Sequence, residues 1–218
     1  MTRHLSRCIG LCVLAAVAPL AARGAGVDAG VKGGLNVSDL NIENTTDLED
    51  SRSGMAAGAW VGLPVTNMFS IQPEALFMMK GDQGRDVVDG TEVTVTAKLD
   101  YVQVPVLAKL ALAPDAAVRP TLFAGPTVGI NTRSKLSAKG ETPDASAEVE
   151  VDIKDDTKPV EMGVVFGGGL DFPFGDSPQS FGVEARYDLG LTNVDDTASS
   201  TDETRTRTFS ILGTYGFL

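Results

Sequence analysis

The sequence predicts an all-β protein, an eight-stranded antiparallel up-and-down transmembrane β-barrel with short periplasmic turns and long outer loops. Three observations lead to this prediction. The chain begins like a secretory signal, eight later segments of about ten residues alternate apolar and polar side chains, and their connections are alternately short and long. Tilted strands of about that length cross a bilayer, and unequal connections at the two ends are typical of outer-membrane barrels.

The N-terminus has the composition of a cleaved signal peptide. Residues 1–7 are basic, residues 8–22 form an apolar run, and small residues follow as far as Ala25. Basic, apolar, then small is the order of a secretory signal, and the run is short for a membrane-spanning helix. We therefore predict a signal peptide over 1–25 and a single barrel domain over 26–218.

Composition excludes several kinds of chemistry. The one His and both Cys (His4, Cys8 and Cys12) fall within the predicted signal peptide. The exported chain would therefore lack Ser-His and Cys-His catalysis, Cys/His zinc sites and disulfides. We predict no enzymatic activity, no cofactor and no metal site.

The charge balance argues against nucleic-acid binding. The net charge of −11 becomes −14 when the three arginines of the signal segment are removed, and no basic patch stands out. Nucleic-acid binding needs clustered basic residues that neutralise phosphates. We therefore expect no nucleic-acid partner.

The eight predicted strands follow a period of two, because a strand points neighbouring side chains to opposite faces. In the fourth strand, Val104 and Val106 share an apolar face, and Gln103 and Lys109 share the other. The export signal, the unequal connections and the aromatic last strand favour the apolar face as the lipid face. The predicted strands are 26–36, 54–63, 69–80, 97–112, 119–131, 159–172, 179–190 and 206–218.

The connections fall into two classes. The short, turn-rich ones are 64–67, 113–118 and 173–178. The long, polar ones, rich in Asp and Glu, are 37–53, 81–96, 132–158 and 191–205. Their carboxylates suit calcium or magnesium bridges to lipopolysaccharide, but none has the spacing of a calcium loop, so plain solvation is the simpler interpretation.

A set of polar residues is predicted to point into the barrel. Paired carboxylates there allow acid–base chemistry, but an eight-stranded barrel has an interior just wide enough for side chains to fill. We therefore predict a structural polar plug, in which Lys109 pairs with Glu74 or with another lumen acid. The predicted lumen cluster is Asp28, Lys32, Glu74, Gln103, Lys109, Glu161, Glu184, Arg186 and Asp188.

Several motifs, in order along most of the chain, resemble the PorT-like family of outer-membrane β-barrel domains. The most specific is 99–109, Leu-Asp-Tyr-Val-Gln-Val-Pro-Val-Leu-Ala-Lys, where the family usually has Glu at the position of Gln103. A second departure is Leu218 after the aromatic Phe217. The resemblance implies a fold and a location but no chemistry. The other matching segments are 30–40, 54–81, 123–126, 163–169 and 184–192.

We therefore predict an exported outer-membrane barrel with a filled lumen, acting structurally or through its acidic outer loops. Its expected partners are outer-membrane lipid and lipopolysaccharide, with a protein partner unknown, and we expect a monomer. Two alternatives stay open: a narrow pore for small solutes or ions, and a soluble periplasmic lipocalin-like ligand-binding barrel.

Overall fold

The computed structural model describes residues 26–42, 51–88, 91–142, 145–153, 159–175, 177, 179–192 and 204–217. The predicted signal peptide lies outside these residues. No helix in the described part of the chain is long and apolar enough to cross a membrane. The strands are β1 (Asp28–Ile42), β2 (Arg52–Pro64), β3 (Phe69–Val88), β4 (Thr91–Ala111), β5 (Arg119–Thr142), β6 (Ala145–Asp152), β7 (Val160–Pro173), β8 (Ser180–Gly190) and β9 (Thr204–Gly216).

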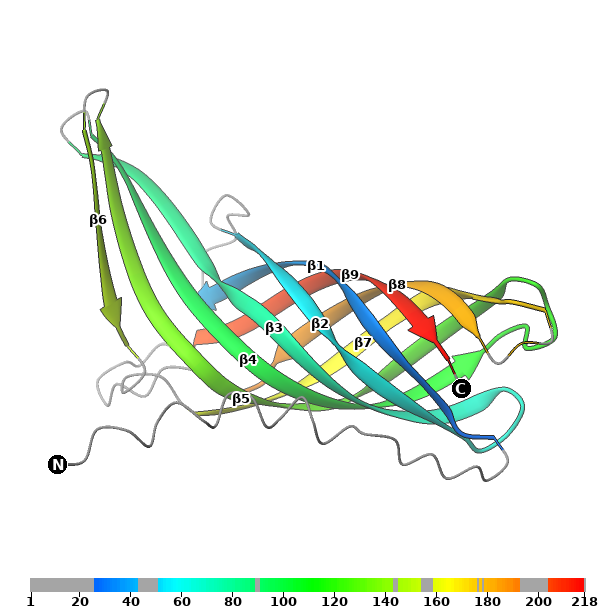
Figure 1. Cartoon of the computed structure of the whole chain (residues 1–218). Helices are drawn as coiled ribbons and strands as arrows, with labels where there is room; N and C mark the ends of the chain where they lie inside the picture. Colours follow the sequence, from blue (N-terminus) through cyan, green and yellow to red (C-terminus); the bar gives the residue numbers. More distant parts are fainter. Residues whose placement is uncertain are drawn as a thin grey trace, which may run out of the picture.

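Eight of these strands close into an antiparallel barrel (Figure 1). Consecutive strands pair around the wall, β9 pairs with β1, and β5 pairs with both β4 and β7. β6 pairs with the outer part of β5 and takes no part in the closure. The prediction of an all-β, eight-stranded up-and-down barrel is confirmed.

The predicted short connections are the turns at one end of the barrel, where the C-terminus also lies (Figure 1). In the first turn the Val65 amide donates to the Phe69 carbonyl over 2.9 Å. The Thr66 hydroxyl accepts a hydrogen bond of 3.0 Å from the Phe69 amide. Such turns mark the periplasmic end of an outer-membrane barrel.

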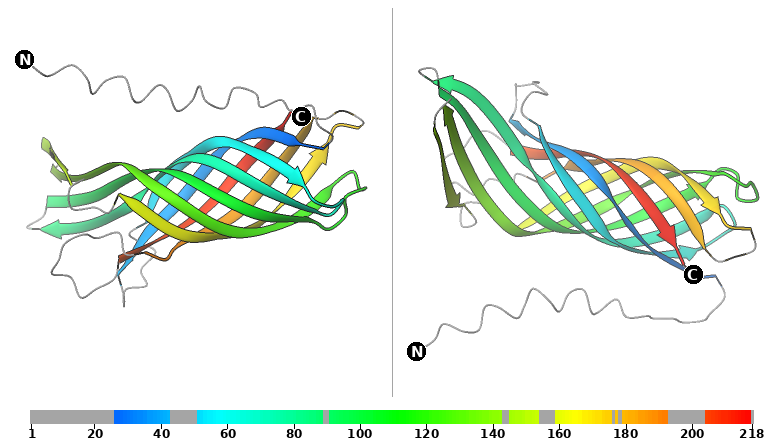
Figure 2. Two further views of the ribbon diagram at one scale, coloured as in Figure 1. Left: turned by 90° about the horizontal axis from the view of Figure 1, so that it is seen from below. Right: turned by 45° about the horizontal axis from the view of Figure 1, so that its top comes forward.

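Two of the predicted outer loops are instead continued strand. β3 and β4 run on to Val88 and from Thr91, and β5 and β6 form a second hairpin beside them, so 81–96 and most of 132–158 were wrongly assigned as loop. The reason is visible in 91–97, where Thr and Val keep the period of two. These strands rise beyond the barrel wall as an outer extension (Figures 1 and 2).

Gly81 marks the place where the outer extension leaves the barrel. It has φ +145°, and a Cβ there would lie 1.9 Å from the Ala97 carbonyl oxygen. The pairing of β4 with β5 shifts register nearby, between Asp100 and Tyr101. Only glycine tolerates both this backbone conformation and this close approach.

The barrel is apolar outside and polar inside. Val104 is 43% exposed on the outer wall, and Val106 shares its face, whereas Gln103 is 2% exposed and faces the lumen. Lys109 also faces inward, as predicted. Because a slip of one residue would reverse every side chain, this alternation fixes the register of the wall against the lipid.

Aromatic side chains gather on the outer wall near the turns. The rings of Tyr215 and Phe217 have centroids 6.5 Å apart, as do those of Phe172 and Phe181. Tyr187 lies farther along β8, against Phe166. Aromatic girdles at the bilayer interfaces are typical of membrane barrels.

Candidate functional site: the charged lumen

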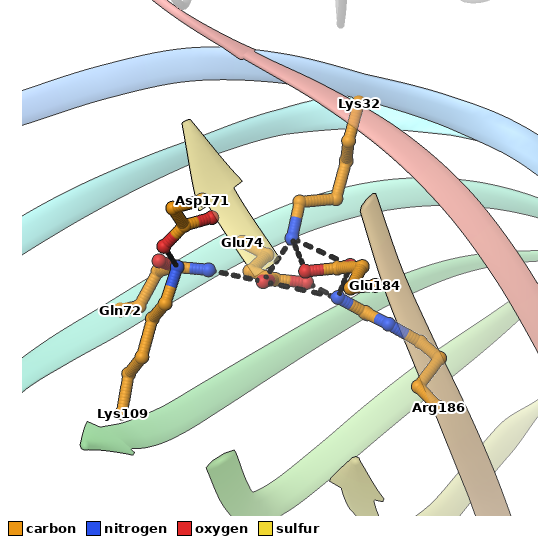
Figure 3. Close-up of polar contacts among 7 residues, drawn as sticks. All are labelled: Lys32, Gln72, Glu74, Lys109, Asp171, Glu184 and Arg186. Atoms are coloured by element: carbon orange, nitrogen blue, oxygen red, sulfur yellow. Dashed lines mark hydrogen bonds and ion pairs between the residues drawn. The ribbon is translucent and has the colours of Figure 1, made fainter. Parts of the chain in front are cut away.

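Four charged side chains meet in the middle of the barrel and form what we call the central charge cluster: Lys32, Glu74, Glu184 and Arg186 (Figure 3). The Lys32 ammonium donates to Glu74 over 2.7 Å and to Glu184 over 2.9 Å. The Arg186 guanidinium donates to Glu74 over 2.8 Å and also contacts Glu184. β1, β3 and β8 thus bring together residues far apart in the sequence.

The central charge cluster is electrically balanced and almost completely buried. It holds two cations and two carboxylates, and none of its four side chains is more than 6% exposed. The Gln72 amide donates a further hydrogen bond of 2.7 Å to Glu74. Charged hydrogen bonds of this kind are strong, and removing one partner leaves a buried charge unpaired.

Apolar side chains pack inside the barrel on either side of the charges. Leu107, Phe123 and Val165 form one buried group, and the Arg186 guanidinium lies 5.4 Å from the Phe123 ring centroid. Ala56, Leu76, Met78 and Leu212 form the other buried group. Sequence reasoning did not single out these two groups, although they share the inward parity of their strands.

A second polar group lies toward the outer end of the lumen. Glu161 is 3.6 Å from the Lys80 ammonium and contacts the Thr206 hydroxyl, and Asp188 is buried as well. The Lys80 ammonium also lies 5.4 Å from the Tyr101 ring centroid. Lys80 was missed as a lumen residue, although it is in phase with Glu74 on the same strand.

Three predicted residues, Lys109, Asp28 and Gln103, lie outside both of these polar groups. Lys109 forms an ion pair of 2.8 Å with Asp171. The prediction was a pair with Glu74 or with another acid in the lumen, and Asp171 is such an acid. The expected first partner of Lys109, Glu74, is already held by the central charge cluster. Asp28 lies at the start of β1, at the turn end, and Gln103 lies deeper, opposite Leu76.

A cavity of about 370 Å³ lies inside the turn end of the barrel, and we call it the vestibule. Lys32, Gln72 and Glu184 from the central region line it, together with turn residues such as Pro114 and Ser177. The vestibule therefore extends from the periplasmic turns to the central charge cluster.

A different charged group lies on the outer extension. Glu150 of β6 accepts a hydrogen bond of 3.3 Å from Lys98 and another from Lys135. These hydrogen bonds, the one from Lys135 foremost, hold the pKa of the Glu150 carboxyl below its ordinary value. The acidic stretches 43–50, 154–158 and 193–203 lie outside the described residues.

The lumen geometry favours packing over reaction chemistry. Each carboxylate of the central charge cluster is held between two cations, so neither is placed as a proton donor beside a free base. In the described part of the chain, no three His, Cys, Asp or Glu side chains come together as a metal site.

A closed barrel with an apolar wall and a charged lumen defines an outer-membrane β-barrel. Consistently, residues 19–196 match the family model described as outer membrane protein beta-barrel domain. The chain therefore belongs to this family, and its location is the outer membrane. The soluble periplasmic carrier considered above is excluded. No curated protein matches the chain.

Three solved structures illustrate what the chain resembles. Ail, the attachment invasion locus protein of Yersinia pestis, in complex with the heparin analogue sucrose octasulfate, is 12% identical, with 88% of this chain and 99% of Ail covered and a TM-score of 0.43. Neisserial surface protein A is 10% identical, with 87% and 97% covered and a TM-score of 0.45. The outer membrane enzyme PagL is 12% identical, with 87% and 98% covered and a TM-score of 0.34. At these values the likenesses carry no argument about function.

Proposed function

We propose that the protein is a non-enzymatic outer-membrane barrel whose lumen is plugged by its own side chains, and which acts structurally or through its outer surface. The observation that carries this proposal is the central charge cluster, a balanced and buried group that spans the lumen between β1, β3 and β8.

The physical argument concerns what an ion would have to displace. Lys32 and Arg186 each contact both carboxylates, so passage would require breaking several charged hydrogen bonds at once. Each such bond is worth more than a neutral one. Apolar side chains such as Leu107 and Leu76 leave little polar surface around the charges for a hydrated ion.

Planar-bilayer recording of the folded, full-length protein tests the plug. Folding is checked beforehand by the difference in gel mobility between boiled and unboiled samples. We expect no steady conductance at either polarity. A steady ohmic current would favour the alternative, a narrow pore for small solutes or ions.

The outer surface is proposed to contact lipopolysaccharide. In support, the acidic outer stretches supply carboxylate oxygens that suit bridging divalent cations. The test compares the thermal stability of the barrel in bilayers with lipopolysaccharide, with magnesium or with a chelator. Magnesium should raise the midpoint temperature of unfolding in bilayers that contain lipopolysaccharide, and in no others. An equal rise in plain phospholipid would contradict this interaction.

Three finer assignments complete the proposal. The motif at 99–109 supports membership of the PorT-like part of the family. The basic and apolar order of residues 1–25 supports a cleaved signal peptide. The four charges of the central charge cluster are paired within one chain, which supports a monomer.

A further inference from the structure

The vestibule is lined by six charged side chains, and four of them form ion pairs with each other. Lys109 pairs with Asp171, and Lys32 pairs with Glu184. The remaining two are one acid, Asp28, and one base, Arg119. Asp28 interacts electrostatically with both Lys109 and Arg119, but among the described residues neither Asp28 nor Arg119 makes a hydrogen bond or a direct ion pair.

Two buried donors in the vestibule wall have no acceptor. The Arg119 Nε and the Trp60 Nε1 are both buried without a hydrogen-bond partner among the described residues. An unsatisfied buried donor costs about 1–3 kcal/mol in general. Both atoms have almost no accessible surface, so a ligand oxygen would satisfy either donor only once its side chain turns toward the vestibule.

Interior glycines keep the vestibule open. Gly62 and Gly182 occupy lumen-facing positions. Several other lumen-facing positions on the strands carry charged side chains. A Cβ at Gly182 would lie 2.6 Å from the Thr214 hydroxyl and 2.7 Å from an Asp171 carboxylate oxygen. A Cβ at Gly62 would lie 3.2 Å from the Asp28 Cβ.

We propose that the vestibule is a periplasm-facing binding site for a small zwitterion, an α-amino acid or short peptide with free termini. The carboxylate of the ligand contacts Arg119 and the Trp60 indole NH, and its ammonium contacts Asp28. A singly charged ligand would contact only one of the two wall charges. The cavity of about 370 Å³ is within the size range of small-ligand sites.

The site binds whether or not the central charge cluster conducts ions. A steady current in bilayer recordings would therefore contradict the proposal of a plugged lumen without contradicting the proposal of a binding site. Conversely, failure to bind a zwitterion would leave the plug in place.

Trp60 makes the test direct, because it is the only Trp of the chain and lines the vestibule. The folded full-length protein in detergent is titrated with glycylglycine, acetate and methylammonium while tryptophan fluorescence is followed. We expect saturation by glycylglycine at a concentration at least about tenfold below that for either singly charged probe. Calorimetry on the same samples provides a second measurement.

Matched variants identify the contacts. Asp28→Asn and Arg119→Gln should each weaken glycylglycine binding by about tenfold or more, whereas Lys135→Gln on the outer extension should leave it unchanged. If Arg119→Gln does not fold, Arg119→Lys keeps the charge, loses Nε and should still weaken binding. Acetate binding as tightly as glycylglycine, wild-type affinity in Asp28→Asn, or no saturation in either measurement would overturn the proposal.

Discussion

The central charge cluster and the charged group on the outer extension are built from the same chemistry in opposite surroundings. In the lumen, Glu74 lies between Lys32 and Arg186 with side chains at most 1% exposed. On the extension, Glu150 lies between Lys98 and Lys135 with side chains 28–33% exposed. A carboxylate contacts two cations in both places, but only the lumen carboxylate is buried. Exposed ion pairs contribute little, whereas breaking a buried one is costly.

The largest effect should follow the loss of Glu74. Glu74→Ala leaves two buried cations without this acceptor, so we expect a loss of about 3–5 kcal/mol in the free energy of unfolding. The measurement is urea unfolding from lipid bilayers. Glu150→Ala is the matched control and should change stability little. Equal losses in the two variants would mean that burial does not decide the strength of these contacts.

The next effect compares the two faces of one strand. Val104→Lys places an ammonium against lipid and should cost about 2–4 kcal/mol. Gln103→Lys directs the charge into the polar lumen, opposite Gly129 on β5. The fraction of folded protein, read from the gel-mobility shift, should fall far more for Val104→Lys. Equal tolerance of Lys at both positions would contradict the facing described here.

The smallest effect is a pH dependence confined to the extension. The pKa of Glu150 is lowered by hydrogen bonds from Lys135 and Lys98. The contribution of these bonds is therefore complete above the ordinary value of 4.5 and is lost as pH falls through the lowered pKa. Hydrogen-exchange protection factors of β6 should fall over that range. Glu150→Gln should remove the pH dependence, and an unchanged profile in this variant would assign it to other groups.

The period of two made the wall predictable, but not the partners across the lumen. Val104, Gln103 and Lys109 take the predicted faces because alternation is a local property of each strand. The pairing of Lys109 with Asp171 depends on β4 and β7 lying on the two sides of β5, which no local pattern contains. Lys32 and Glu184 likewise meet only after the barrel closes through β9.

The outer extension shows a different limit of the sequence argument. The polar composition of 81–96 and 132–158 predicts loop, although the alternation of Thr and Val in 91–97 favours strand. The vestibule could not be predicted either. It depends on interior glycines such as Gly182, and on Arg119, which begins a strand after a turn and was not assigned to the lumen.

The central claim is that the side chains of the central charge cluster close the lumen. Its most direct test is the bilayer current of a variant in which Lys32, Glu74, Glu184 and Arg186 are all replaced by Ser, once its gel-mobility shift shows that it folds. If it does not fold, the charge-balanced pair Glu74→Ala with Arg186→Ala replaces it. The account predicts a steady current in the variant and none in the wild-type protein. A silent variant, or a wild-type protein that conducts equally, would contradict it.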